Sequence, residues 1–93
     1  MYRTETVNRW VVEQHEELND RRKAEYRING IDPDNYWTLK CSYKTERDAI
    51  FQRDRCREIH ATICEQFNSE KTQTYRVRDI GKEMTFEVQG GLF

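Results

Sequence analysis

Cys56, His60 and Cys64 are the residues of this chain whose types and spacing could bind a metal ion. They recur every four residues, so that on a helix all three would project from one face, and Cys41 precedes them in the chain. Structural zinc sites usually begin with two cysteines in a tight turn, whereas this spacing spans two turns of a helix. Three ligands spread in this way rarely converge on one ion. We therefore expect reduced cysteines that pack as small apolar side chains, with no metal and no cofactor.

The sequence contains no recognisable catalytic motif. It contains no catalytic triad, phosphate-binding loop or complete metal motif, and nothing beside the cysteines and His60 indicates an oxyanion hole. We therefore predict that the protein is not an enzyme.

Arginine is the second group of side chains with a chemical use, since it makes up eleven of the sixteen basic residues. Its planar guanidinium group binds carboxylates and phosphates through two hydrogen bonds at once. Arg76 and Arg78 are two residues apart, so a strand would present both on one polar face. That face is either a solvated surface paired with carboxylates such as Glu87, or a surface that binds single-stranded nucleic acid together with an exposed Tyr36.

A long helix is predicted over residues 45–67. Thr45 is followed three residues later by Asp48, a variant of the capping box that satisfies free N–H groups at a helix start. At 100° per residue, the side chains expected to face the core are Ala49, Cys56, Ile59, His60, Ile63, Cys64 and Phe67.

Phe51 falls on the opposite, polar face of this predicted helix, beside Arg47 and Arg55. An exposed aromatic side chain surrounded by arginine has the composition of an interface hot spot. Single exposed apolar residues are equally common on ordinary surfaces, so both interpretations stay open.

Strands are predicted on both sides of the helix. Residues 36–43 alternate with period two, with Trp37, Leu39, Cys41 and Tyr43 on one side. Residues 74–79 and 84–88 also alternate, and Gly81 between them predicts a hairpin whose apolar side, including Met84 and Phe86, covers the helix.

The first third of the chain admits two interpretations. Residues 9–14 favour a strand because of Trp10 and two valines, and residues 15–35 then form a helical or loose excursion ended by turn residues. The alternative is one long helix from Val7 to Ile28. With the strand, the chain is a single α+β domain of ββαββ order, in which an antiparallel sheet of about four strands packs on one long helix.

Composition sets the remaining limits. The chain has 93 residues and a net charge of −1, which argues against non-specific adhesion to nucleic acid or membranes. No segment approaches the roughly 20 apolar residues of a membrane span, and the first residues lack the apolar region of a secretory signal. Three cysteines do not make a disulfide framework. We expect a soluble protein of the cytoplasm.

The arrangement resembles small single-domain proteins of bacteriophages and mobile elements, above all the anti-CRISPR inhibitors. The segments that carry this resemblance are RWVV at residues 9–12, YWTL at 36–39, YKTERDA at 43–49 and YRVRD at 75–79. The resemblance implies a non-enzymatic protein that binds and blocks a host protein or protein–RNA complex. The candidate partner-binding residues are Phe51, Arg47 and Arg55 on the helix, with Arg76 and Arg78 on the sheet. The alternative is a small nucleic-acid-binding or regulatory module that uses the sheet arginines.

Overall fold

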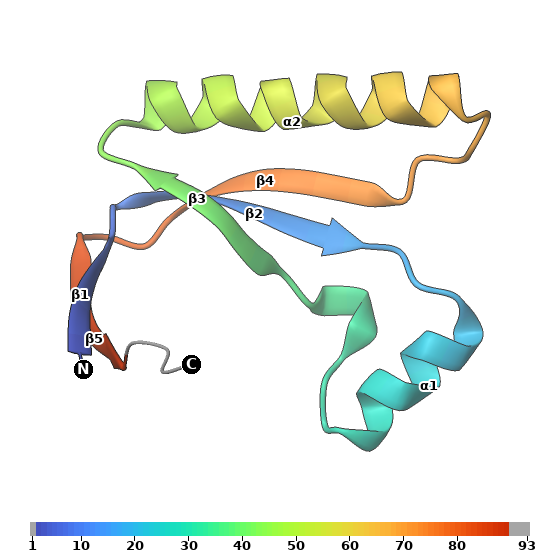
Figure 1. Cartoon of the computed structure of the whole chain (residues 1–93), viewed down its shortest axis with the longest axis horizontal. Helices are drawn as coiled ribbons and strands as arrows, with labels where there is room; N and C mark the ends of the chain where they lie inside the picture. The colour runs from blue at the N-terminus through green and yellow to red at the C-terminus, as the bar shows by residue number, and fades with distance from the viewer. Residues whose placement is uncertain (1, 90–93) are drawn as a thin grey trace.

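Two helices, a short 3-10 helix and five strands make up the part of the chain that the computed structural model describes, residues 2–89. In chain order they are β1 (Tyr2–Val7), β2 (Trp10–Glu16), α1 (Asp20–Ile28), η1 (Pro33–Asn35), β3 (Thr38–Tyr43), α2 (Glu46–Gln66), β4 (Gln73–Asp79) and β5 (Met84–Gln89). The long α2 helix lies along one face of an antiparallel sheet (Figure 1). This confirms the predicted α+β class with one long helix packed on a sheet.

The α2 helix begins and ends with residues suited to those positions. The Thr45 hydroxyl accepts a hydrogen bond from the Asp48 backbone N–H at 3.2 Å, so the cap read from the sequence is present. After the C-cap Phe67, Asn68 has a φ of 49°, a left-handed conformation that asparagine tolerates better than most residues. The structure thus places α2 within one residue of the predicted range at each end.

The central sheet has the strand order β3-β2-β4, and all of its pairings are antiparallel. Val12 on the middle strand lies opposite Val77 of β4 and Cys41 of β3, and its side chain is fully buried. Ala49 of α2 is also fully buried, which lets the helix approach the sheet closely. The buried apolar residues of the described chain are Val11, Val12, Leu18, Pro33, Ala49, Cys64 and Tyr75. The core is therefore small.

The predicted hairpin of residues 74–79 and 84–88 is wrong. β4 pairs with β2, and β5 pairs with β1 in a separate two-stranded sheet, which we call the terminal ribbon (Figure 1). Gly81 has a φ of 91°, but the chain bends there instead of folding back. The reason is that β1, a polar strand not expected from the sequence, supplies the partner for β5.

The corner between the sheet and the terminal ribbon is held by polar contacts. Two nitrogens of the Arg9 guanidinium group donate to the two carboxylate oxygens of Asp79, each at 2.8 Å, and the Gly81 N–H donates to the same carboxylate. These bonds lower the pKa of Asp79 to about 2. The Ile80 N–H also donates to the Arg9 carbonyl oxygen. This bond holds the segment between β1 and β2 next to the segment between β4 and β5.

A bulge in β3 changes the side to which its residues point. Val12 lies opposite Cys41 but Glu13 lies opposite Leu39, so Lys40 is an extra residue in the ladder. Leu39 therefore lies on the sheet face opposite to that of Cys41. The prediction that both share one face is wrong for this reason.

Residues 15–35 contain the rest of β2 and then α1 and η1, so the alternative of one helix from Val7 to Ile28 is wrong. The Asn19 side chain caps α1 by accepting from the Arg22 N–H at 2.9 Å. Leu18 and Pro33 are buried at the base of this excursion. No helix within residues 2–89 has the length and apolar character needed to cross a bilayer.

Candidate interaction surfaces

The five candidate partner-binding residues lie on two separate surfaces. Arg47, Phe51 and Arg55 are exposed on the side of α2 that faces away from the sheet. Arg76 and Arg78 lie on the sheet face that α2 does not cover, because Tyr75 and Val77, which alternate with them, face the helix. The structure thus brings together the three helix residues, but not the helix residues with the sheet arginines.

Large apolar side chains form a row along α2 in contact with water. Phe51, Ile59 and Ile63 are 66%, 50% and 48% exposed, and Arg55 completes the four-residue spacing. We call Phe51, Arg55, Ile59 and Ile63 the α2 ridge. Rows of residues four apart are the ridges by which helices pack against one another.

The prediction that Ile59, Ile63 and Phe67 face the core is wrong. The stripe of α2 that contacts the sheet carries Ala49 and Cys64, which are buried, and the half-buried Cys56 and His60. A sheet of three strands is narrow, so it covers this stripe and leaves the isoleucines beside it in water. Phe67 follows the last turn as the C-cap and is 71% exposed.

A shallow depression that is open to solvent lies on the α2 ridge, bordered by Phe51, Asp54, Arg55, Glu58 and Ile59. Asp54 forms ion pairs with Arg53 and Arg57. Within the described residues, neither Arg55 nor Glu58 has an ion-pair partner in the chain. The depression therefore offers one free positive and one free negative group between two apolar side chains.

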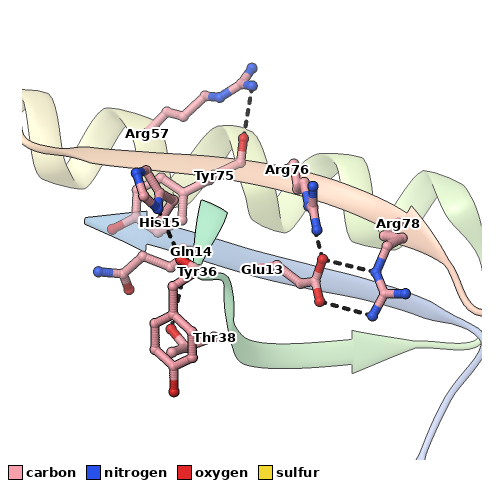
Figure 2. A network of polar contacts seen from close by, with 9 residues as sticks. All are labelled: Glu13, Gln14, His15, Tyr36, Thr38, Arg57, Tyr75, Arg76 and Arg78. Carbon is pink, nitrogen blue, oxygen red and sulfur yellow. Dashed lines mark hydrogen bonds and ion pairs between the residues drawn. The ribbon is translucent and has the colours of Figure 1, made fainter. Parts of the chain in front are cut away.

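The sheet arginines are tied to a buried carboxylate that the sequence interpretation missed. Glu13 is only 6% exposed, and its Oε1 accepts hydrogen bonds from Nε of Arg76 at 2.9 Å and Nε of Arg78 at 3.0 Å. Its Oε2 accepts a third bond, from Nη2 of Arg78 (Figure 2). Arg76 also stacks on Trp37, with its Cζ 4.1 Å from the ring centroid. The sequence did contain a sign of this cluster, because Glu13 is a charged residue that directly follows the apolar residues Val11 and Val12 in a predicted strand.

The electrostatics of this cluster favour the charged form of Glu13. Burial alone would raise the pKa of Glu13, but the hydrogen bonds from Arg78 and Arg76 outweigh it, and the pKa lies below the usual value. The same contact raises the pKa of Arg78. One of the two positive charges is thus neutralised within the fold, which weakens the attraction of this face for phosphates.

A groove next to this cluster is lined by apolar side chains. We call it the sheet groove; it has a volume of about 200 Å³, and its apolar lining is Val7, Val11, Leu39, Ile80, Met84 and Phe86. Glu13 and Arg78 close one side. Met84 and Phe86 are 51% and 45% exposed, so the prediction that they cover the helix is wrong. They miss the helix because β5 belongs to the terminal ribbon.

The cysteine and histidine residues stabilise the fold. Nε2 of His60 accepts hydrogen bonds from the backbone N–H groups of Thr72 and Gln73, both at 3.2 Å, and so links α2 to the start of β4. Burial raises the pKa of the Cys41 thiol, which keeps it protonated and unreactive. All three cysteines are free, and no group of three potential metal ligands occurs among the described residues.

Comparisons with known proteins give no relative for this chain. No family model matches it, and neither do any curated protein or solved structure.

Proposed function

We propose that this chain is a non-catalytic interaction protein that binds a partner protein through the α2 ridge. The observation that carries the proposal is the exposure of Phe51, Ile59 and Ile63 in one row on a helix whose other side packs on the sheet. Ile59 and Ile63 are neighbours in this row, and Arg55 separates them from Phe51. Neighbouring apolar side chains in water cost free energy, and on soluble proteins they commonly mark a contact surface. A rigid helix also loses little conformational entropy when it binds.

The chemistry of the α2 ridge favours a helical or grooved protein partner. A row of residues four apart fits between the ridges of a second helix at a crossing angle of about −50°. Phe51 and Arg55 are of the residue types enriched at the centre of interfaces, and the depression between Phe51 and Ile59 receives a side chain of the partner. Arg55 and Glu58 then fix the orientation of the partner through opposite charges.

The resemblance stated above implies that this partner is a host protein or protein–RNA complex, which the chain would block in the cytoplasm. The free cysteines agree with a reducing compartment. The alternative, a nucleic-acid-binding module on the sheet face, has less support. Glu13 already accepts three hydrogen bonds from the two arginines, and Arg76 occupies one face of Trp37, where a base would otherwise stack.

The test is affinity capture with a matched pair of variants. The tagged chain is incubated with a lysate of its native cells, with and without nuclease, and retained proteins are identified by mass spectrometry. The ridge variant Phe51→Ala, Arg55→Ala, Ile59→Ala is compared with Glu65→Ala, which changes an exposed α2 residue outside the α2 ridge. The affinity of the purified partner for each form is then measured by calorimetry.

We expect a nuclease-resistant partner that the ridge variant binds at least about 30-fold more weakly, the loss of a hot spot of 2 kcal/mol. Glu65→Ala should bind like the unmodified chain. Binding of the ridge variant within twofold of the unmodified chain would show that the surface is misassigned. Loss of all retained material after nuclease would favour the nucleic-acid module instead.

A further inference from the structure

The terminal ribbon has one polar face and one mixed face, on which Val7, Met84 and Phe86 lie beside the ion pair of Arg3 with Glu5. Residues directly opposite in an antiparallel pair share a face, so Val7 lies with Met84, and Thr6 lies with Thr85 on the other side. Phe86 follows Met84 on the mixed face and lies opposite Glu5, and both Met84 and Phe86 line the sheet groove. The apolar part of the mixed face, Val7, Met84 and Phe86, thus borders Leu39 of the central sheet across this groove.

An isolated two-stranded ribbon is at best marginally stable in water and normally requires a third strand or a packed layer. The terminal ribbon extends from one end of the sheet, away from both α1 and α2 (Figure 1). Apart from the corner contacts, the terminal ribbon approaches the rest of the described chain mainly where β1 passes β3. Within residues 2–89, Met84 and Phe86 on the mixed face stay about half exposed.

The dimensions of the chain indicate how much surface lacks a cover. A compact monomer of 11.4 kDa should expose about 5,800 Å², whereas this chain exposes 7384 Å². Its radius of gyration is 15.9 Å, against about 12 Å for a compact domain of this length. The excess of roughly 1,600 Å² belongs to the whole chain, including the exposed side chains of α1 and α2, and is of the size that each subunit of a permanent homodimer buries, about 1,000–2,500 Å².

We propose that two copies of the chain form a homodimer through the sheet groove, with Met84 and Phe86 of each copy packed against Leu39 and Ile80 of the other. A second copy would cover the halves of Met84 and Phe86 that the chain itself leaves in water. A twofold interface requires a surface that is complementary to itself. The sheet groove meets this requirement, since it combines a hollow in the sheet with protruding ribbon side chains.

Two further observations agree with a second copy as the occupant. The net charge is only −1, so that two copies repel each other little. The α2 ridge lies on the other side of the sheet and stays accessible in such a dimer. The dimer would therefore present two ridges, which increases the apparent affinity for any partner that also has two sites. This proposal does not depend on the function proposed for the α2 ridge.

Analytical ultracentrifugation of the purified chain tests the homodimer. The unmodified chain should sediment with twice the mass of 11.4 kDa at micromolar concentration. The variant Met84→Glu, Phe86→Glu should dissociate at least 100-fold more readily, while Thr85→Glu on the opposite ribbon face should remain dimeric. Circular dichroism of each variant shows whether α2 is still folded. A further variant, Ile59→Glu, tests whether the copies pair through the α2 ridge instead.

A second measurement needs no substitution. In a mixture of isotope-labelled and unlabelled chains, filtered nuclear Overhauser spectra should show contacts between the Phe86 ring of one copy and the Leu39 methyl groups of the other. A monomeric mass up to about 100 μM would overturn the proposal. So would a dimer that dissociates only with Ile59→Glu, or one without the contacts between Phe86 and Leu39. If the double variant loses its helix signal in circular dichroism, the contacts between Phe86 and Leu39 in the labelled mixture decide between monomer and homodimer.

Discussion

Replacing Glu13 by glutamine should destabilise the fold while hardly changing its shape. Glu13 is the buried centre of three hydrogen bonds from Arg76 and Arg78 (Figure 2). A glutamine keeps one acceptor oxygen but turns the other side of the group into an NH₂ donor. In one orientation this NH₂ faces Nη2 of Arg78, and in the flipped orientation it faces both Nε donors. No orientation satisfies all three contacts.

The size of the effect depends on two opposing facts: the Glu13 carboxylate is buried, whereas the two arginine side chains are partly in water. Removing one member of a fully buried ion pair typically costs about 3–5 kcal/mol, and a hydrogen bond to a charged group contributes about 1.5–3 kcal/mol. The side chains of Arg76 and Arg78 are 40% and 52% exposed, so water replaces part of what they lose. We expect Glu13→Gln to lower the free energy of unfolding by about 2 kcal/mol at pH 7.

Urea unfolding followed by tryptophan fluorescence measures this change, because Trp37 lies under Arg76. All samples need the same protein concentration, since association would alter the apparent stability. The matched control is Glu25→Gln, which removes the exposed Arg21–Glu25 pair at 3.8 Å and should cost less than about 0.5 kcal/mol.

The pH dependence gives an independent check. The pKa of Glu13 in the folded chain lies below the ordinary value of 4.5. The stabilisation is therefore complete above that value and decreases as the pH falls through the lower pKa of the folded state. A difference between Glu13→Gln and the unmodified chain that stays below 0.5 kcal/mol at pH 7, or that is equally large at pH 7 and at pH 3, would refute this account.

Two further predictions concern the start of α2 and the corner of the sheet. Thr45→Ala removes the cap contact to the Asp48 N–H and should cost about 1 kcal/mol in urea unfolding, whereas Thr62→Ala, the same change at an exposed position inside α2, should be neutral or slightly stabilising. Equal effects of the two changes would show that the cap contributes nothing. The Asp79 carboxyl should titrate in a carbon NMR experiment with a pKa of about 2, and Arg9→Gln should return the pKa toward 3.8. Stability from this pair is present above pH 3.8 and is lost as the pH falls toward 2, and an Asp79 that titrates near 3.8 in the unmodified chain would contradict the corner geometry.

Local signals in the sequence were sufficient for α2 and for the α+β class. Thr45 and the spacing after it specify a helix start through contacts within one turn, so neighbouring residues decide the outcome. The pairing of β5 with β1 was not predictable in this way. β1 consists mainly of threonine, glutamate and arginine and shows no apolar alternation, and its partner lies at the other end of the chain. Which strands pair is decided by the whole sheet and not by the turn between neighbours.

The candidate surfaces, like the fold, were predictable only where neighbouring residues decide the outcome. The exposure of Phe51 follows from helical periodicity alone, and the structure agrees with it. The exposure of Ile59 and Ile63 depends on the width of the sheet under α2, and the position of Leu39 depends on the extra residue Lys40 in β3. Both are properties of the assembled fold. The contact of Glu13 with Arg76 and Arg78 likewise required the register of β2 with β4.

The pairing of the first two strands with the last two also affects how the chain folds during synthesis. Arg9 and Asp79, which join at the corner of the sheet, are 70 residues apart in the sequence. At roughly 5–20 residues per second, a ribosome needs several seconds to make that interval, and during this time β2 has only β3 as a strand partner. Such long-range pairing gives a high contact order and slow folding. The nascent chain therefore exposes Val11 and Val12, the centre of its future core, until β4 has been made, which makes this interval the period of greatest aggregation risk.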